Sequence, residues 1–112
     1  MSATAWTTVC PFERLVPERG VAALVEGTQV AVYRLADDRV LAVQQRDPYS
    51  GANVLSRGIV GSVGETPTIT SPMYKQVWDL TTGECLDPSG KEPESLRTFE
   101  VAVEDGTVLV RA

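Results

Sequence analysis

Histidine is absent from this chain of 112 residues. Without an imidazole, the chain cannot hold a histidine-ligated haem, most kinds of zinc site, or a nucleophile activated by histidine. Cysteine is scarce as well, since Cys10 and Cys85 are the only two and are too few for a cluster held by four thiolates. We interpret both as small buried apolar side chains. A disulfide between them stays open, because sequence alone does not give their separation.

Long hydrophobic runs and nucleotide-binding motifs are missing too. The longest apolar run covers residues 21–25, which is too short to cross a bilayer, so we expect no membrane partner. Residues 1–6 lack the basic and apolar regions of a signal peptide. We therefore expect a cytoplasmic protein, and two free thiols agree with that compartment. No Gly-x-Gly-x-x-Gly motif or Walker loop occurs, so no nucleotide site is recognisable.

Positive charge is also in short supply. The net charge of −5 and the pI near 4.6 argue against a nucleic-acid partner, because phosphate binding needs a clustered basic face. Residues 44–78 are the exception, with a net charge of +1 against −6 for the remainder. Either the turn-rich loops of this region contain few acids for no functional reason, or the region is a contact surface.

The residues that are present indicate one all-β domain over residues 1–112. Hydrophobic residues make up 43% of the chain and charged residues 22%, as in ordinary folded proteins, and the length suffices for one core. No segment shows a sustained helical period of apolar residues, whereas short runs separated by turns indicate strands. We predict strands at residues 7–9, 20–25, 29–35, 40–45, 68–70, 76–80, 84–86, 98–104 and 107–111.

The last two of these strands form the clearest hairpin. Phe99, Val101 and Val103 alternate with other side chains, and Val108 and Val110 do the same after an Asp-Gly turn. We therefore expect one face of the hairpin to be buried and the other to be wet.

Two segments are predicted to be loops. Residues 46–67 are rich in Gly, Ser, Asn and Pro and form an unusually long connection, which is typical of functional or disordered loops. We expect this loop to be ordered, since Val54, Leu55 and Ile59 give it apolar side chains to bury. Residues 87–95 are predicted to be a solvated connection, to which we assign no chemistry.

Two short segments in the middle of the chain, residues 47–51 and 71–75, match the frame of a Rieske iron–sulfur site. Such a site needs a Cys-x-His pair and a later Cys-x-x-His pair, which supply two thiolates and two imidazoles. Pro48 and Pro72 fit this frame, but the four ligand positions are occupied by Asp47, Tyr49, Ser71 and Tyr74. The chain therefore resembles a Rieske-like [2Fe-2S] ferredoxin-type antiparallel β-sandwich, with a small degenerate cluster-loop subdomain at residues 46–79.

The resemblance can be narrowed to one family. Residues 47–61, followed by residues 71–76, are similar to the small subunit of the cytoplasmic NAD(P)H-dependent nitrite reductase, and the similarity extends from Trp6 to the turn at residues 105–106. The resemblance implies a large subunit that carries FAD, a [4Fe-4S] cluster and siroheme and reduces nitrite to ammonium. It implies that this chain is the non-catalytic partner, which has no cofactor of its own and supports the large subunit in nitrate assimilation.

Without a cluster, another interaction must hold the two loops together. We hypothesise that the side chains at the four ligand positions, Asp47, Tyr49, Ser71 and Tyr74, join the loop tips directly. Tyrosine rings can pack while their hydroxyls find partners, and carboxylates and hydroxyls bind loop amides. The alternative is that these four are unrelated surface residues.

Other residues are candidates for contact with a partner or for the core. The candidate partner interface consists of Arg46, Arg57, Met73 and Lys75, in part because methionine and tyrosine, which occur together in residues 73–75, are enriched at interfaces. An anion site for nitrite at Arg46, beside Asp47, and at Arg57 is the weaker interpretation, because a small anion needs several converging donors. Trp6 and Trp78 are predicted to be core residues, with an interface as the alternative.

Two rival interpretations stay open. A true Rieske-class electron-transfer ferredoxin would need a different metal site, since the four ligands are lacking. A free-standing Rieske-like interaction module would use the same scaffold, without a cluster, to bind another oxidoreductase. An independent enzyme is disfavoured, because no constellation of acid–base residues indicates a site.

Overall fold

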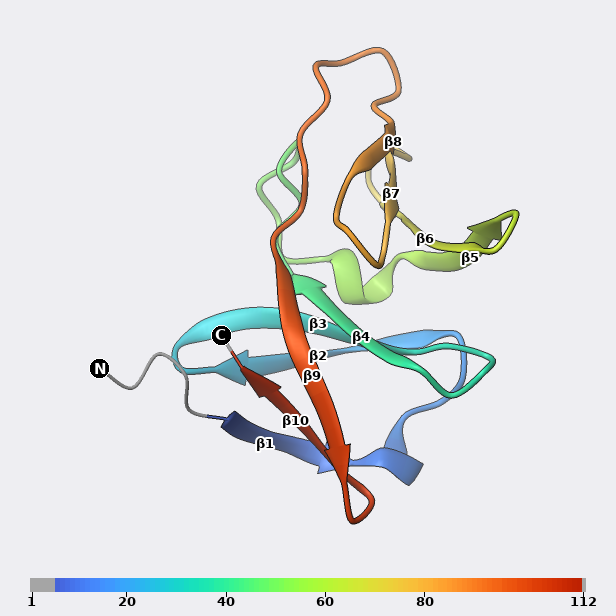
Figure 1. Ribbon diagram of the computed structural model, residues 1–112. Helices are drawn as coiled ribbons and strands as arrows, with labels where there is room; N and C mark the ends of the chain where they lie inside the picture. Colours follow the sequence, from blue (N-terminus) through green and yellow to red (C-terminus); the bar gives the residue numbers. More distant parts are fainter. Residues whose placement is uncertain (1–5, 112) are drawn as a thin grey trace.

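The computed structural model describes residues 6–111 and consists almost entirely of strands and loops (Figure 1). The elements in chain order are β1 (Trp6–Pro11), the 3-10 turn η1 (Phe12–Arg14), β2 (Arg19–Val25), β3 (Thr28–Arg34), β4 (Val40–Gln44), the 3-10 turn η2 (Leu55–Arg57), β5 (Ile59–Val63), β6 (Thr66–Thr70), β7 (Val77–Asp79), β8 (Cys85–Asp87), β9 (Thr98–Glu104) and β10 (Thr107–Arg111). The strands form two antiparallel sheets.

Six strands form the larger sheet, in the order β1-β10-β9-β4-β3-β2. This sheet curls until its two edge strands, β1 and β2, contact each other, which produces the near-barrel in the lower half of Figure 1. Apolar side chains at alternate positions fill its interior, among them Val30 and Val32 of β3 and Val108 and Val110 of β10. All four are fully buried, because alternate residues of a strand point to the same face.

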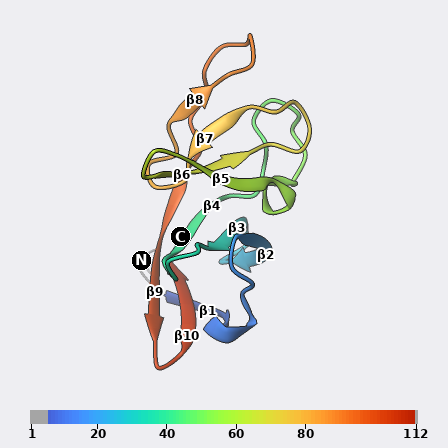
Figure 2. The same ribbon diagram turned by 90° about the vertical axis from the view of Figure 1, so that its right-hand side faces the viewer.

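The smaller sheet has the order β5-β6-β7-β8 and lies above the larger one in Figures 1 and 2. A second core joins the two sheets and contains Ala31 and Tyr33 of β3, Ile69 of β6 and Trp78 of β7. Strand β3 is therefore buried on both faces over residues 30–33. The candidate site described below lies next to this second core, against which Tyr49 packs.

The all-β prediction is confirmed, and helical structure in the described residues is limited to the two 3-10 turns. The predicted strands 98–104 and 107–111 match β9 and β10 at both ends, and the others are displaced by one or two residues. The expected burial of one hairpin face holds for Phe99 and Val110. It is wrong for Val103, which is 46% exposed because it lies near the free tip of the hairpin.

Residues 46–67 are not one long loop, contrary to the prediction. They contain η2 and the whole of β5, which pairs with β6 through a tight turn in which Gly64 has a φ of +61°. The prediction failed because Gly61 and Ser62 interrupt the apolar pattern, so an exposed edge strand gives only a weak alternation signal. The expectation of an ordered segment agrees with the complete burial of Leu55.

The cysteines and tryptophans divide between the two cores and the surface. Cys10 and Cys85 are free and only half-buried, and they pack against different cores, so they form neither the disulfide nor the fully buried pair of the sequence interpretation. Trp78 is fully buried, as predicted. Trp6 is 41% exposed and not a core residue, and the guanidinium of Arg111 lies 4.6 Å from its ring centre.

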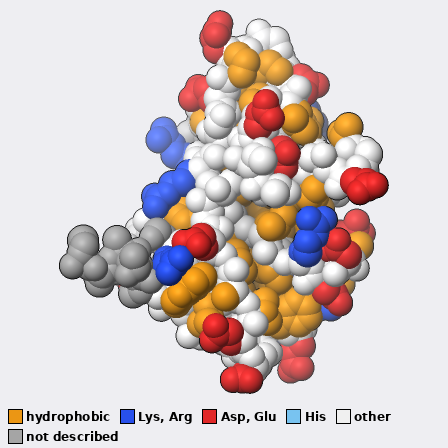
Figure 3. All heavy atoms as spheres, viewed as in Figure 1, with side chains coloured by type: hydrophobic (Ala, Val, Ile, Leu, Met, Phe, Trp, Pro, Cys, Tyr) orange, Lys and Arg blue, Asp and Glu red, His pale blue; other side chains and the backbone are white. Residues whose placement is uncertain are grey.

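The surface carries the excess negative charge. In Figure 3, acidic side chains lie at the upper and lower ends of the molecule and along its right edge, among fewer basic ones. Within residues 6–111, no helix is long and apolar enough to cross a membrane. The expectation that no signal peptide is present rests mainly on residues 1–5, which lie outside the described residues.

Candidate functional site

The two loops of the Rieske-like frame meet at Asp47 and Ser71. The Ser71 hydroxyl donates a hydrogen bond of 2.5 Å to Oδ2 of Asp47. Both side chains are shielded from solvent, with exposed fractions of 0% and 1%. This is the direct connection between the loop tips that the sequence hypothesis expects for these two residues.

Local hydrogen bonds shape the first loop around Asp47. Its Oδ1 accepts bonds from the backbone N–H of Tyr49 at 2.8 Å and of Ser50 at 3.4 Å, which is an Asx turn. The Asp47 carbonyl accepts a bond from the N–H of Gly51, whose φ of +78° suits glycine. The carboxylate therefore both folds its own loop and binds the other one.

Ser71 has the same double role in the second loop. Its Oγ accepts a hydrogen bond of 3.1 Å from the N–H of Met73, and its own N–H donates to the carbonyl of Gln76 at 2.9 Å. Lys75 closes the loop with a φ of +68°, which is uncommon for a residue with a side chain. Such a backbone persists only where surrounding bonds hold it, and here those bonds converge on Ser71.

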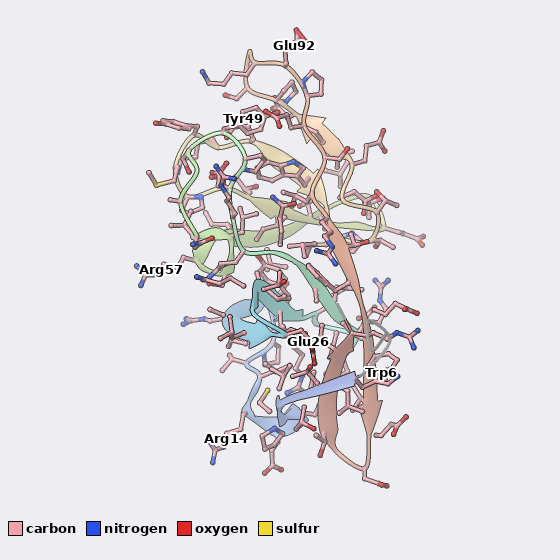
Figure 4. The ribbon with its side chains drawn as sticks, turned by 90° about the vertical axis from the view of Figure 1, so that its left-hand side faces the viewer. Trp6, Arg14, Glu26, Tyr49, Arg57 and Glu92 are labelled. Carbon is pink, nitrogen blue, oxygen red and sulfur yellow. The ribbon has the colours of Figure 1, made fainter. Side chains whose placement is uncertain are left out.

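Tyr49 binds a third segment, residues 87–95, instead of the second loop. Its hydroxyl donates to the carbonyl of Glu92 at 2.6 Å and accepts from the N–H of Glu94 at 2.9 Å. Figure 4 shows Tyr49 beneath Glu92 at the upper end of the molecule. The Tyr49 ring lies 6.0 Å from that of Trp78, whose Nε1 donates to the Glu94 carbonyl. The segment that sequence analysis left without a role is therefore anchored to the site.

Burial raises the pKa of the Tyr49 phenol above its ordinary value of 10.0, and the neighbouring Cys85 thiol raises it further. The hydroxyl oxygen and Cys85 Sγ are 3.8 Å apart. The phenol is therefore neutral at physiological pH, where it can both donate and accept. A phenolate could not donate to the Glu92 carbonyl.

The joining hypothesis is wrong for Tyr74. This side chain is 50% exposed, and its hydroxyl has no hydrogen-bond partner among the described residues. It lies with Met73, which is 47% exposed, and Lys75 at the tip of the second loop. The structure thus brings Asp47 and Ser71 together, directs Tyr49 to another segment, and leaves Tyr74 on the surface.

The four residues of the candidate partner interface are all exposed: Arg46, Arg57, Met73 and Lys75. Arg46 lies beside the first loop, where a Cβ added to Gly51 would be 3.5 Å from its guanidinium nitrogen. Arg57 lies on η2 and points outward in Figure 4, at the wall of a cavity that also contains Arg19. The candidates therefore occupy the second loop tip, the flank of the first loop and η2.

Two interactions at the base of the loops, one buried and one part-buried, were not found from the sequence. The Tyr33 hydroxyl donates a 2.5 Å hydrogen bond to the carbonyl of Leu55, and burial raises the pKa of this phenol. Gly20 makes room for the ring, since a Cβ there would lie 2.6 Å from Tyr33 Cε1. Gly20 lies opposite Tyr33 in the β2–β3 ladder. This contact could have been predicted only if the register of the two strands had been known.

A second pair consists of Ser56 in η2 and Gln45, the residue directly after β4, which form reciprocal hydrogen bonds of 2.8 and 2.7 Å. Gln76 is fully buried as well, and its side-chain amide has no protein partner within the described residues. Both glutamines were invisible to sequence reasoning, because glutamine is usually a surface residue.

The side chains at the four ligand positions do not fit a Rieske cluster. Such a cluster takes thiolates and imidazoles, whereas this set supplies a carboxylate, an aliphatic hydroxyl and two phenols: Asp47, Ser71, Tyr49 and Tyr74. The carboxylate and the aliphatic hydroxyl already bind each other. Within residues 6–111, no group of three or more His, Cys, Asp and Glu side chains could hold a metal ion. The arrangement is suited to joining loops by hydrogen bonds.

The chain is similar to known proteins in both sequence and structure. Residues 5–111 match the family model of the Rieske-like [2Fe-2S] domain, which confirms the predicted fold. The nitrite reductase (NADH) small subunit of Escherichia coli K12 is 35% identical over 107 residues, which cover 95% of this chain and 96% of that relative. A crystal structure described as an NADH-dependent nitrite reductase small subunit from Mycobacterium tuberculosis is 43% identical, with a TM-score of 0.87 over 96% of this chain and 94% of that chain.

One further relative differs in its length. The nitrite reductase [NAD(P)H] large subunit of Klebsiella oxytoca is 37% identical over 105 residues, which cover 94% of this chain but only 11% of that protein. A region similar to this chain is therefore part of a much longer polypeptide in that organism.

Proposed function

This chain belongs to the family of NAD(P)H nitrite reductase small subunits, within the Rieske-like [2Fe-2S] domains, and from this premise we propose that it is a non-catalytic subunit that binds and supports a siroheme-containing large subunit. The large subunit would carry FAD and a [4Fe-4S] cluster as well and would reduce nitrite to ammonium. The setting would be nitrate assimilation in the cytoplasm.

The hydrogen bond between Asp47 and Ser71 carries the non-catalytic part of the proposal. It occupies the place where a Rieske protein would have two of its ligands, and the two loops close without metal. The four ligand positions of such a chain offer no thiolate or imidazole for a redox cluster. We therefore propose that it contains no cluster, and that its contribution to nitrite reduction is structural.

The Klebsiella relative supports the choice of partner. Because a region similar to this chain is part of a protein named as a large subunit, the two parts are expected to act side by side when they are separate chains. We propose that the exposed residues Arg46, Arg57, Met73 and Lys75 contribute to that contact. Met73 offers apolar area, and the three basic residues lie in the least acidic region of the chain.

The test is nitrite-dependent NADH oxidation by the purified large subunit from the same organism, with and without this protein at matched concentration. We expect the two proteins to co-elute, and the activity or its lifetime at elevated temperature to rise in the complex. If no complex forms and neither quantity changes, the subunit proposal is wrong. The alternative, a free-standing module for another oxidoreductase, would then replace it.

Iron analysis and a visible absorption spectrum separate this proposal from the ferredoxin interpretation. We expect a colourless preparation without stoichiometric iron, because the four ligand positions supply neither thiolate nor imidazole. Stoichiometric iron with a visible absorption band would contradict the structural role.

A further inference from the structure

A groove made of two adjacent cavities lies between the two sheets along β5. Two cavities of about 420 and 210 Å³ form it, and both have Glu18 and Val60 in their walls. Gly20 and Gly58 line the larger cavity, and a Cβ added at either would lie within 2.6 Å of a backbone oxygen. Glycine at these positions therefore allows β2, η2 and β6 to approach closely enough to form the walls.

Strand β5 presents an open edge to this groove, because β6 is its only partner strand among residues 6–111. Ser62 stands opposite Pro67, and since proline has no N–H the two cannot form a hydrogen-bonded pair. The Pro67 carbonyl instead accepts a bond from the N–H of Leu80 on the other side of β6. Hydrogen-bonded and non-hydrogen-bonded pairs alternate along an antiparallel ladder, so the Val60–Ile69 pair, two positions away, is also non-hydrogen-bonded. Val60 and Ser62 therefore direct their N–H and C=O groups away from β6.

This edge lacks the features that normally prevent strand pairing. Natural edge strands carry charges, prolines or bulges, or are covered by other elements. Residues 59–63 contain no charge and no proline, and their pairing with β6 has no bulge. Within residues 6–111, no backbone hydrogen bond outside the β5–β6 ladder involves Val60 or Ser62. Ile59 and Val63 are 65% and 64% exposed, so an added strand would also cover apolar side chains.

The two ends of the groove differ in charge. Arg19 and Arg57 line the larger cavity, and neither belongs to an ion pair in the described part of the chain. That wall contains one acidic residue, so its charge is positive. At the other end, Arg39 is already bound to Asp37 at 2.9 Å, and Glu65 leaves that end negative.

We propose that β5 accepts an extended segment of the nitrite reductase large subunit as a fifth strand of the smaller sheet. This inference rests on the proposed function. The segment pairs with the backbone N–H and C=O groups of Val60 and Ser62, and its apolar side chains lie beside Ile59 and Val63. It carries an Asp or Glu residue at the arginine end of the groove, where the two guanidinium groups lack carboxylate partners.

Two observations favour this occupant. In the Klebsiella relative, a region similar to this chain is part of a polypeptide named as a large subunit. A segment of the large subunit is therefore the occupant that the comparisons support. The positive charge at the arginine end of the groove also favours a segment with an acidic residue at that end, although the chain as a whole is acidic. A segment of about five residues, roughly 17 Å long, matches β5.

The first test compares the affinity of the purified large subunit for the wild-type chain and for Ser62→Pro. Proline at this position removes an outward N–H, obstructs an added strand and leaves the β6 side of the ladder intact. Ala22→Pro is the matched control on β2, the edge of the other sheet. The Val25–Thr28 pair closes the two-residue β2–β3 turn and is hydrogen-bonded. Pairs alternate from there, so Ala22, three residues earlier, is in a non-hydrogen-bonded pair and also directs its backbone groups outward.

We expect Ser62→Pro to raise the Kd about tenfold or more, and Ala22→Pro to change it less than about twofold. Equal affinities for wild type and Ser62→Pro overturn the strand addition but leave the subunit role standing. If the wild-type chain does not bind the large subunit, the proposed function and this inference are both wrong.

Amide hydrogen exchange on the unmodified protein gives a readout that does not depend on the folding of a variant. In the free chain, the amides of Ile59, Gly61 and Val63 should exchange slowly and those of Val60 and Ser62 rapidly, because only the first three face β6. In the complex, Val60 and Ser62 should become at least tenfold slower. Unchanged exchange at these two residues in a complex that does form overturns the inference.

Charge reversal tests the acidic end of the added segment. Arg19→Glu should weaken the complex more at low than at high salt, because the interaction it removes is screened. Equal loss at both salt concentrations contradicts the acidic contact. Concentration-dependent dimerisation of the free chain, with slow exchange of the Val60 and Ser62 amides, would assign the edge to a second copy of this chain and overturn the proposal.

Discussion

Ser71 donates a hydrogen bond to Asp47 across the two loops of the Rieske-like frame, and neither side chain is reached by solvent. The same two side chains also organise their own loops, since Asp47 accepts the N–H of Tyr49 and Ser71 accepts that of Met73. One short bond therefore does the joining for which a cluster would otherwise be needed.

Removing this bond should destabilise the protein. We expect Ser71→Ala to lower the free energy of unfolding by about 2 kcal/mol, because it leaves a buried carboxylate without one of its donors. Denaturant unfolding followed by tryptophan fluorescence measures the change. Ser95→Ala is the control, since Ser95 is exposed, and should stay within about 0.5 kcal/mol of wild type. Equal stability of the two variants would contradict the joining role of Ser71.

The two tyrosines of the frame should respond differently to the same chemical change. Tyr49→Phe removes a hydroxyl that binds Glu92 and Glu94, and we expect it to cost about 1–2 kcal/mol of stability and to expose residues 87–95 to protease. Tyr74→Phe should be close to neutral, because the Tyr74 side chain is half exposed. Limited proteolysis and denaturant unfolding of both variants test this. A larger loss for Tyr74→Phe would restore the sequence hypothesis.

Two glycines with the same backbone conformation should differ in their tolerance of alanine. Gly83 and Gly90 have φ values of +81° and +84°, but a Cβ on Gly83 would overlap the carbonyl oxygen of Leu96, whereas nothing lies near one on Gly90. Gly90→Ala should cost about 1 kcal/mol for its backbone alone, and Gly83→Ala about 2 kcal/mol more. Thermal unfolding of the pair measures the difference. Equal losses would mean that Leu96 can move away.

Alkaline pH should destabilise the protein through the phenols of Tyr33, which is buried, and Tyr49, which is half-buried. Burial raises the pKa values of Tyr33 and Tyr49 above 10.0, with Cys85 adding to the shift at Tyr49. Above about pH 10 the unfolded chain releases these protons while the folded chain retains them, so proton release favours unfolding. The stabilising contribution is therefore complete below pH 10 and is lost as the pH rises toward the folded-state pKa values.

Denaturant midpoints at pH 8 and pH 10.5 check this expectation. The midpoint should fall between the two pH values, and it should fall less for Tyr49→Phe than for wild type, since that variant has one fewer shifted phenol. A midpoint that rises with pH, or an equal fall in both proteins, would contradict the assignment.

Much of the fold follows from short-range sequence patterns. The alternation over residues 98–104 and 107–111 and the Asp-Gly turn between them place β9 and β10 without help from the rest of the chain. Strand β5 was missed because Gly61 and Ser62 break its apolar pattern. Its extended conformation is stabilised by pairing with β6, which local propensity does not reveal.

The candidate site was likewise predicted from the sequence only in part. Sequence placed Asp47, Tyr49, Ser71 and Tyr74 in one frame, and the absence of histidine determined that no Rieske ligand set could be present. Which of these side chains meet was decided by tertiary structure. The burial of Asp47 and Ser71, the direction of Tyr49 toward residues 87–95 and the exposure of Tyr74 depend on contacts between residues 24 to 45 positions apart.

The amino-acid sequence by itself determined the all-β class, the family and the chemistry that this chain lacks, because these depend on composition, local periodicity and spacing. Only the tertiary structure decided the groove along β5 and its charged ends. Its walls come from β2, η2, β5 and β6. These elements approach each other so closely at Gly20 and Gly58 that a side chain would not fit there. Such close approach is a property of packed backbones, and no local pattern encodes it.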